Sequence, residues 1–142
     1  MRTNGWNSVL TLGLLLTIAL ACNFSASTAN ISGLKLGKDK NVSTETHSFG
    51  PRDTVYALAD IANAPGKVKV KGRLIVDDVE GQTKGPIPGL EDTVELGGSG
   101  TAIFTFSPAS NGWPKGKYKL EVLMLNEAGE QKDQKESSFT VS

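Results

Sequence analysis

The chain of 142 residues has few of the residue types on which catalytic and metal sites are usually built. Cysteine occurs once, at Cys22, so no disulfide can form within the chain and a folded domain must be held together by packing. Histidine also occurs once, at His47, which leaves a metal site or a catalytic triad without evident partners. We therefore expect no catalytic residues, no metal and no cofactor.

The chain also lacks an excess of charge of either sign. Lys+Arg and Asp+Glu both number 15, so the formal net charge is zero. Binding to nucleic acids depends on neutralising phosphates with an excess of basic residues. The sequence therefore gives little support for a nucleic-acid partner, and we expect none.

A long hydrophobic run is lacking as well. The longest, from Val9 to Ala21, has roughly 13 residues, whereas a membrane-spanning helix needs about 20. It follows the positively charged Arg2 and ends in the small-residue pattern Ala-Leu-Ala immediately before Cys22. This order of features predicts a signal peptide over residues 1–21.

The junction resembles the lipobox of bacterial lipoproteins, in which a small residue directly precedes a cysteine that becomes acylated. Leucine usually stands three residues before that cysteine, whereas here Ala19 holds the position and Leu20 follows it. The resemblance implies that Cys22 is the lipid attachment site and that residues 22–30 form a polar tether. A free thiol at the N-terminus of an exported protein would be open to oxidation, and acylation gives it a role.

A lipidated Cys22 implies an exported protein that is anchored to a membrane of the cell envelope. The residue after the cysteine is Asn23 and not an aspartate, and the resemblance to proteobacterial lipoproteins implies the outer membrane if the source has one. The alternative is a secreted, soluble protein that is cleaved after Ala21 and carries no lipid.

Beyond the tether, several segments alternate apolar and polar residues with a period of two, as half-buried strands do. Strands are expected over residues 30–36, 42–49, 54–61, 67–77, 93–96, 101–106, 117–125 and 130–141. Residues 81–92 are expected to form a loop, because Pro86 and Pro88 exclude a central strand. Gly97-Gly98-Ser99-Gly100 is interpreted as a hairpin turn. Seven or eight short strands with regular turn signals predict one all-β, antiparallel sandwich over residues 31–142.

Two motifs in this region resemble small bacterial immunoglobulin-like or fibronectin III-like domains. They are Phe49-x-Pro51-x-Asp53-Thr54-Val55 and Trp113-Pro114-x-Gly116-x-Tyr118. The resemblance covers roughly residues 48–142 and implies an immunoglobulin-like sandwich. It also implies that the Tyr118 hydroxyl ties a loop to the backbone, as in a tyrosine corner. It implies no particular function.

Two features are candidates for ligand binding. Lys67, Lys69, Lys71 and Arg73 alternate with apolar residues, which places four cations on one face of a sheet. This basic stripe could bind a polyanion, or it could be a solvated face that is paired with acids of neighbouring strands. Trp113 could stack on a sugar ring, or it could cover the end of the sandwich.

The sequence as a whole predicts a cell-envelope lipoprotein that acts as a non-catalytic module for protein binding or assembly and docks through a sheet face or edge. Its partners would be the membrane, through the lipid, and an envelope protein. The alternative is a module that binds carbohydrate or a polyanion, such as a polysaccharide, through the basic stripe or Trp113.

Overall fold

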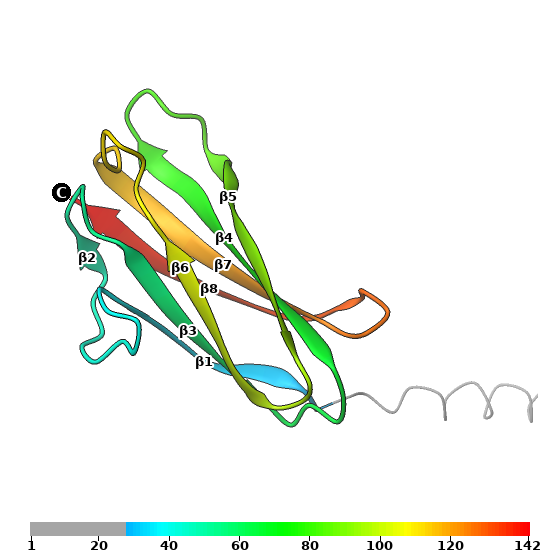
Figure 1. The fold of residues 1–142 in the computed structure, drawn as a ribbon. Coiled ribbons are helices and arrows are strands. Elements are labelled where there is room, and N and C mark those ends of the chain that lie inside the picture. The colour runs from blue at the N-terminus through cyan, green and yellow to red at the C-terminus, as the bar shows by residue number, and fades with distance from the viewer. Residues whose placement is uncertain (1–27) are drawn as a thin grey trace, which may run out of the picture.

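The computed structural model describes residues 28–142 (Figure 1). The expected signal peptide and Cys22 lie outside the described residues. The described chain forms eight strands: β1 (Asn30–Gly37), β2 (Ser48–Phe49), β3 (Val55–Ala62), β4 (Val68–Val79), β5 (Gly85–Leu96), β6 (Gly100–Phe106), β7 (Gly116–Leu125) and β8 (Gln131–Val141). Within residues 28–142 no helix could cross a membrane.

The strands form two sheets that pack face to face. One sheet has three strands in the order β1-β3-β6, and the other has five in the order β2-β8-β7-β4-β5. All pairs are antiparallel except β2 with β8, which run parallel. The predicted all-β, immunoglobulin-like sandwich of seven to eight strands is confirmed, and the parallel pair is its one departure from a purely antiparallel arrangement.

The core fills the space between the two sheets. Its members come from alternate positions of the strands, as the period-two pattern predicts, and include Val55, Ala57 and Ala59 of β3, Val70 and Leu74 of β4, and Leu120, Val122 and Met124 of β7. At the centre of β4, Gly72 leaves room for the Phe104 ring, because a Cβ at Gly72 would stand 2.9 Å from a carbon of that ring. The two sheets can therefore approach closely at this point.

Three local predictions are wrong. Of the expected strand 42–49, only Ser48–Phe49 is extended; Val42 instead has a φ of 46° in a turn where Ser43 donates hydrogen bonds to the Asp39 carboxylate. The expected loop 81–92 is largely strand, because β5 begins at Gly85. Residues 97–100 join strands of different sheets, so they do not form a hairpin turn.

Candidate functional site

The basic stripe lies on the outer face of the five-stranded sheet, except for Lys67, which precedes β4. Two of its cations are paired with acids of the neighbouring strands. Lys71 Nζ lies 3.1 Å from Glu91 Oε1, and the Arg73 guanidinium contacts Glu121 Oε1 through both Nε (2.6 Å) and a terminal nitrogen (2.5 Å). Lys69 lies opposite Glu95 in the β4–β5 register. The geometry is that of a sheet face on which charges of both signs alternate.

Trp113 closes one end of the sandwich. Its side chain is 7% exposed, its indole Nε1 donates a hydrogen bond to the main-chain oxygen of Asp53 at 2.7 Å, and its ring packs edge to face against Tyr118. The Tyr118 hydroxyl donates to the Pro114 oxygen at 2.5 Å, which confirms the expected tie between loop and backbone. Burial raises the pKa of Tyr118 above its ordinary value. Neither ring stands free in solvent.

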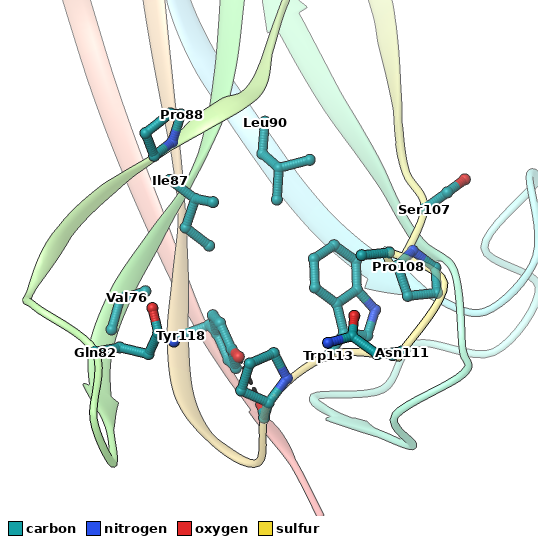
Figure 2. Close-up of a pocket in the computed structure, with 13 residues that line it drawn as sticks. Val76, Gln82, Ile87, Pro88, Leu90, Ser107, Pro108, Asn111, Trp113 and Tyr118 are labelled. Atoms are coloured by element: carbon teal, nitrogen blue, oxygen red, sulfur yellow. Dashed lines mark hydrogen bonds between the residues drawn. The ribbon is translucent and has the colours of Figure 1, made fainter.

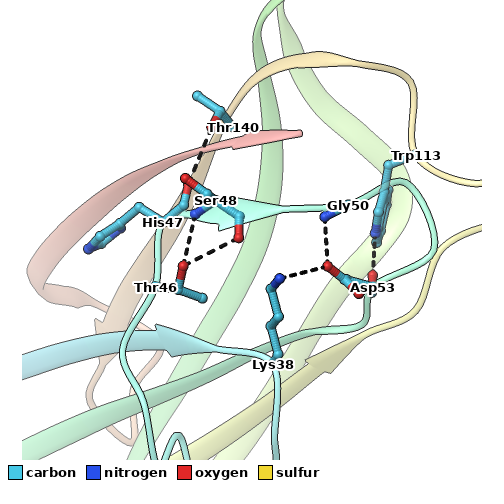
Figure 3. A network of polar contacts seen from close by, with 8 residues as sticks. All are labelled: Lys38, Thr46, His47, Ser48, Gly50, Asp53, Trp113 and Thr140. Carbon is cyan, nitrogen blue, oxygen red and sulfur yellow. Dashed lines mark hydrogen bonds and ion pairs between the residues drawn. The ribbon is translucent and has the colours of Figure 1, made fainter. Parts of the chain in front are cut away.

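A polar network holds the loop that faces Trp113 (Figure 3). The Asp53 carboxylate accepts a hydrogen bond from the Gly50 amide at 2.6 Å and pairs with Lys38 Nζ at 3.1 Å. The Gly50 hydrogen bond first, and Lys38 second, lower the pKa of Asp53. Because the Asp53 main-chain oxygen also receives the Trp113 indole, this network fixes the ring at the end of the sandwich.

An apolar cleft that the sequence reasoning missed opens beside Trp113 (Figure 2). Its volume is about 430 Å³, and it lies between β5 on one side and the loop from β6 to β7 on the other. The apolar lining includes Val76, Ile87, Pro88, Leu90, Trp113 and Tyr118. Of the side chains in residues 28–142 that line the cleft, none belongs to Asp, Glu, Lys, Arg or His.

A large bulge in β5 forms one wall of this cleft. The register runs from the pair Arg73–Glu91 to the pair Ile75–Pro86, so that Leu74 of β4 faces the whole segment Ile87-Pro88-Gly89-Leu90 of β5. Gly89 has a φ of 82°, a conformation that favours glycine. A bulge bends its strand and re-aims its side chains. Here it holds Ile87 and Leu90 partly buried against the core.

The sequence carried one signal for this wall. Ile87 and Leu90 are the apolar residues of a segment that is otherwise Pro and Gly, which resembles a loop by composition. Two large apolar side chains in a segment that is expected to be a solvent-exposed loop indicate that the segment packs against the core. The bulge breaks the alternation of apolar and polar residues, so this segment lacks the period-two pattern of a strand.

The edges of the two sheets are protected unequally. The Asp133 and Lys135 side chains bond to the backbone of Ile31 and cap the edge of β1. The edge strand β2 has only two residues, and β5 carries Pro86 and Pro88. Strand β6 (GTAIFTF) has neither proline nor charge, and within residues 28–142 no strand pairs with its outer side. Short length, proline and charge are the usual protections of an edge strand, so β6 is the least protected edge of this sandwich.

Strand β6 also lies in an uncharged part of the chain. From Leu96 to Pro114 the sequence has no Asp, Glu, Lys, Arg or His. On the outer face of the small sheet, Ile103 of β6 is 41% exposed and lies opposite the half-buried Leu58. Tyr56, also half-buried, lies two pairs farther along the strand on the same face, opposite Thr105. This surface, which we call the β6 side, has one neighbouring charge, the Asp60 carboxylate of β3, which accepts a hydrogen bond from Thr101 of β6. The outer face of the large sheet carries several charges of both signs.

The described residues contain no arrangement that suggests a metal site. In residues 28–142, no three or more His, Cys, Asp and Glu residues are grouped so that they could hold a metal ion. His47 lies beside β2, where its Nδ1 is 3.0 Å from the Ser138 main-chain oxygen and its Nε2 is 3.8 Å from a Glu45 carboxylate oxygen.

No protein-family model and no curated protein matches the chain. Solved structures do resemble it. A Niemann-Pick type C2 protein from the Japanese carpenter ant matches with a TM-score of 0.50 and 13% identity, over 84% of this chain and 96% of that chain. A β-glucosidase involved in saponin metabolism from intestinal bacteria matches with a TM-score of 0.51 and 18% identity, over 82% of this chain and 16% of that chain.

An immunoglobulin-like protein from Pseudomonas aeruginosa matches with a TM-score of 0.45 and 11% identity, over 83% of this chain and 99% of that chain. The match to the β-glucosidase concerns a small part of a much longer chain. At such low identity, the likeness to the carpenter-ant protein and the β-glucosidase shows a shared sandwich fold and nothing about activity.

Proposed function

We propose that this protein is a lipid-anchored, non-catalytic module of the cell envelope that binds a partner protein through the β6 side. The observation that carries the proposal is the unprotected, uncharged edge of β6 next to the exposed Ile103. An edge strand offers unpaired main-chain N–H and C=O groups, and an extended segment of another protein can add to it as a further strand. The partner is therefore expected to present an extended, uncharged segment.

The position of β6 suits a module that is held at its N-terminal end. The register pairs Asn30 with Ala62, and Ile61 with Gly100, so the first strand starts at the same end of the sandwich as β6. Strand β6 then runs away from that end (Figure 1). With Cys22 acylated, a tether that enters here would leave the length of β6 accessible above the membrane surface.

Photo-cross-linking in intact cells tests the proposal. The photoreactive residue p-benzoylphenylalanine is placed at position 103 on β6 or, as a matched control, at position 93 on the outer face of β5. Both positions are exposed and lie in edge strands of opposite sheets. We expect position 103 to give a discrete protein adduct and position 93 to give none.

A second variant examines the edge itself. Because position 103 carries lysine in this variant, the p-benzoylphenylalanine is placed at position 105 of the same strand. A lysine in an edge strand opposes strand addition, so Ile103→Lys should remove the adduct that forms from position 105. Equal adducts at positions 93 and 103, or persistence of the adduct in Ile103→Lys, would refute docking at β6. An adduct with polysaccharide alone would support the carbohydrate-binding alternative instead.

A further inference from the structure

We infer that the apolar cleft beside Trp113 binds a single alkyl chain with an uncharged polar head. The cleft is distinct from the outer edge of β6, and the inference stands whether or not a partner adds to that edge. Its volume of about 430 Å³ lies within the range of small-molecule sites, roughly 300–1,000 Å³. It is therefore large enough for a whole small ligand.

The lining excludes a charged group from the inner part of the cleft. The polar atoms of the two rings are already used, because the Trp113 indole donates to Asp53 and the Tyr118 hydroxyl donates to Pro114. The rings thus present carbon to the cleft, as do Ile87 and Leu90. A charge placed there would lose its hydration without gaining a partner. An alkyl chain would lose only unfavourable contact with water.

The rim offers hydrogen bonds for a head group. Gln82, Ser107 and Asn111 line the cleft, are exposed, and have no side-chain hydrogen bond within residues 28–142 (Figure 2). Amide and hydroxyl groups donate and accept, so they match an alcohol or an ester head. The occupant is therefore an amphiphile whose chain enters between β5 and the β6–β7 loop and whose head stays at the mouth.

The probes are the straight-chain alcohols hexanol, octanol, decanol and dodecanol. Trp113 is the only tryptophan after residue 6, so in protein that starts at residue 22 all tryptophan fluorescence comes from a ring that lines the cleft. We expect saturable changes in Trp113 emission. The affinity should rise about fourfold for each added methylene until the chain fills the cleft, and should then level off.

Two variants block the cleft in different ways. Ile87→Lys puts a charge in its wall and should weaken decanol binding at least about tenfold. Ala109→Phe fills the cleft from an exposed loop position without removing a packed atom, and should abolish binding in a folded protein. Ile103→Lys makes the same kind of change as Ile87→Lys outside the cleft and should leave affinity within about twofold.

Absence of any saturable signal up to the solubility of dodecanol would overturn the inference, and so would equal binding by wild type and Ala109→Phe. Failure here is distinguishable from failure of docking at β6, because Ile103→Lys is expected to remove the cross-linked adduct and spare alkanol binding. Loss of both in that variant would also contradict the assignment of two separate sites.

Discussion

At the residue scale, Asp53 joins three parts of the end of the sandwich. Its carboxylate accepts a hydrogen bond from the Gly50 amide and forms an ion pair with Lys38, while its main-chain oxygen accepts a hydrogen bond from the Trp113 indole. The sequence placed Asp53 in a motif but gave no hint of these contacts, because Lys38 and Trp113 are remote from it in sequence. Only the tertiary arrangement brings the three side chains together.

Asp53→Asn is expected to reduce the free energy of unfolding at pH 7 by about 1 kcal/mol, because it replaces a charge-assisted hydrogen bond and an ion pair. The pKa of Asp53 is lowered in the folded state, so its contribution is complete above the unfolded value of about 3.9 and is lost as pH falls through the folded value. The difference between wild type and variant should therefore shrink below about pH 4. Urea unfolding at pH 7 and pH 3, followed by Trp113 fluorescence, measures it.

Lys38→Met is the companion variant, since it removes the ion pair and leaves the hydrogen bond from Gly50 intact. Because Asp53→Asn weakens both contacts and Lys38→Met removes only one of them, Lys38→Met should cost less than Asp53→Asn. A difference between wild type and Asp53→Asn that stays constant from pH 7 to pH 3 would argue against a role for the carboxylate charge.

At the element scale, period-two alternation predicted regular strands well and irregular ones poorly. Strands β3, β6 and β7 follow their expected ranges closely because each is a continuous strand with one buried face. In β1, Ile31 and Leu34 both pack on the core although they are three residues apart, because a bulge between Ile31 and Gly33 shifts the alternation. The bulge in β5 had a larger effect. Because of it, a segment that is strand was predicted to be a loop, and the cleft that it lines was not predicted.

The outer face of β4 shows that a local sequence pattern does not determine which residues of neighbouring strands pair with its cations. Alternation correctly put the cations of the strand on one face, but it could not show which neighbours meet them. The structure supplies Glu91 from β5 and Glu121 from β7, and Glu121 is itself largely buried under Arg73 and Gln134. Pairing partners come from the order of strands in the sheet, which a single sequence does not reveal.

The basic stripe is therefore expected to bind polyanions weakly. On immobilised dextran sulfate, wild type and Lys69→Glu should elute together at low salt, since Lys71 and Arg73 are already neutralised by acids. Glu91→Gln with Glu95→Gln should raise retention, because it removes the acids that face Lys71 and Lys69. Tight retention of wild type that Lys69→Glu abolishes would instead support the polyanion-binding alternative.

At the scale of the whole molecule, the sandwich has two different ends. Strand β1 begins at the end that holds the connections between β3 and β4 and between β5 and β6, whereas the loop from β6 to β7 lies at the opposite end (Figure 1). That loop carries Trp113 and lines the cleft. A protein tethered through its N-terminus would thus present the cleft away from the membrane and the β6 edge alongside. Both proposed sites remain accessible in that orientation.

The tether itself leads to the last prediction. If Cys22 is acylated, wild type expressed in a bacterium should incorporate a clickable fatty acid and fractionate with membranes, because two or more acyl chains give stable anchoring. Cys22→Ser should lose the label and move to the soluble fraction, while its urea unfolding midpoint should match that of wild-type residues 22–142 without lipid. Position 22 precedes the described sandwich, so the substitution should not alter the core. A wild-type protein that is soluble, unlabelled and cleaved after Ala21 would show that export occurs without an anchor, and the β6 edge and the cleft would then act in a diffusing protein.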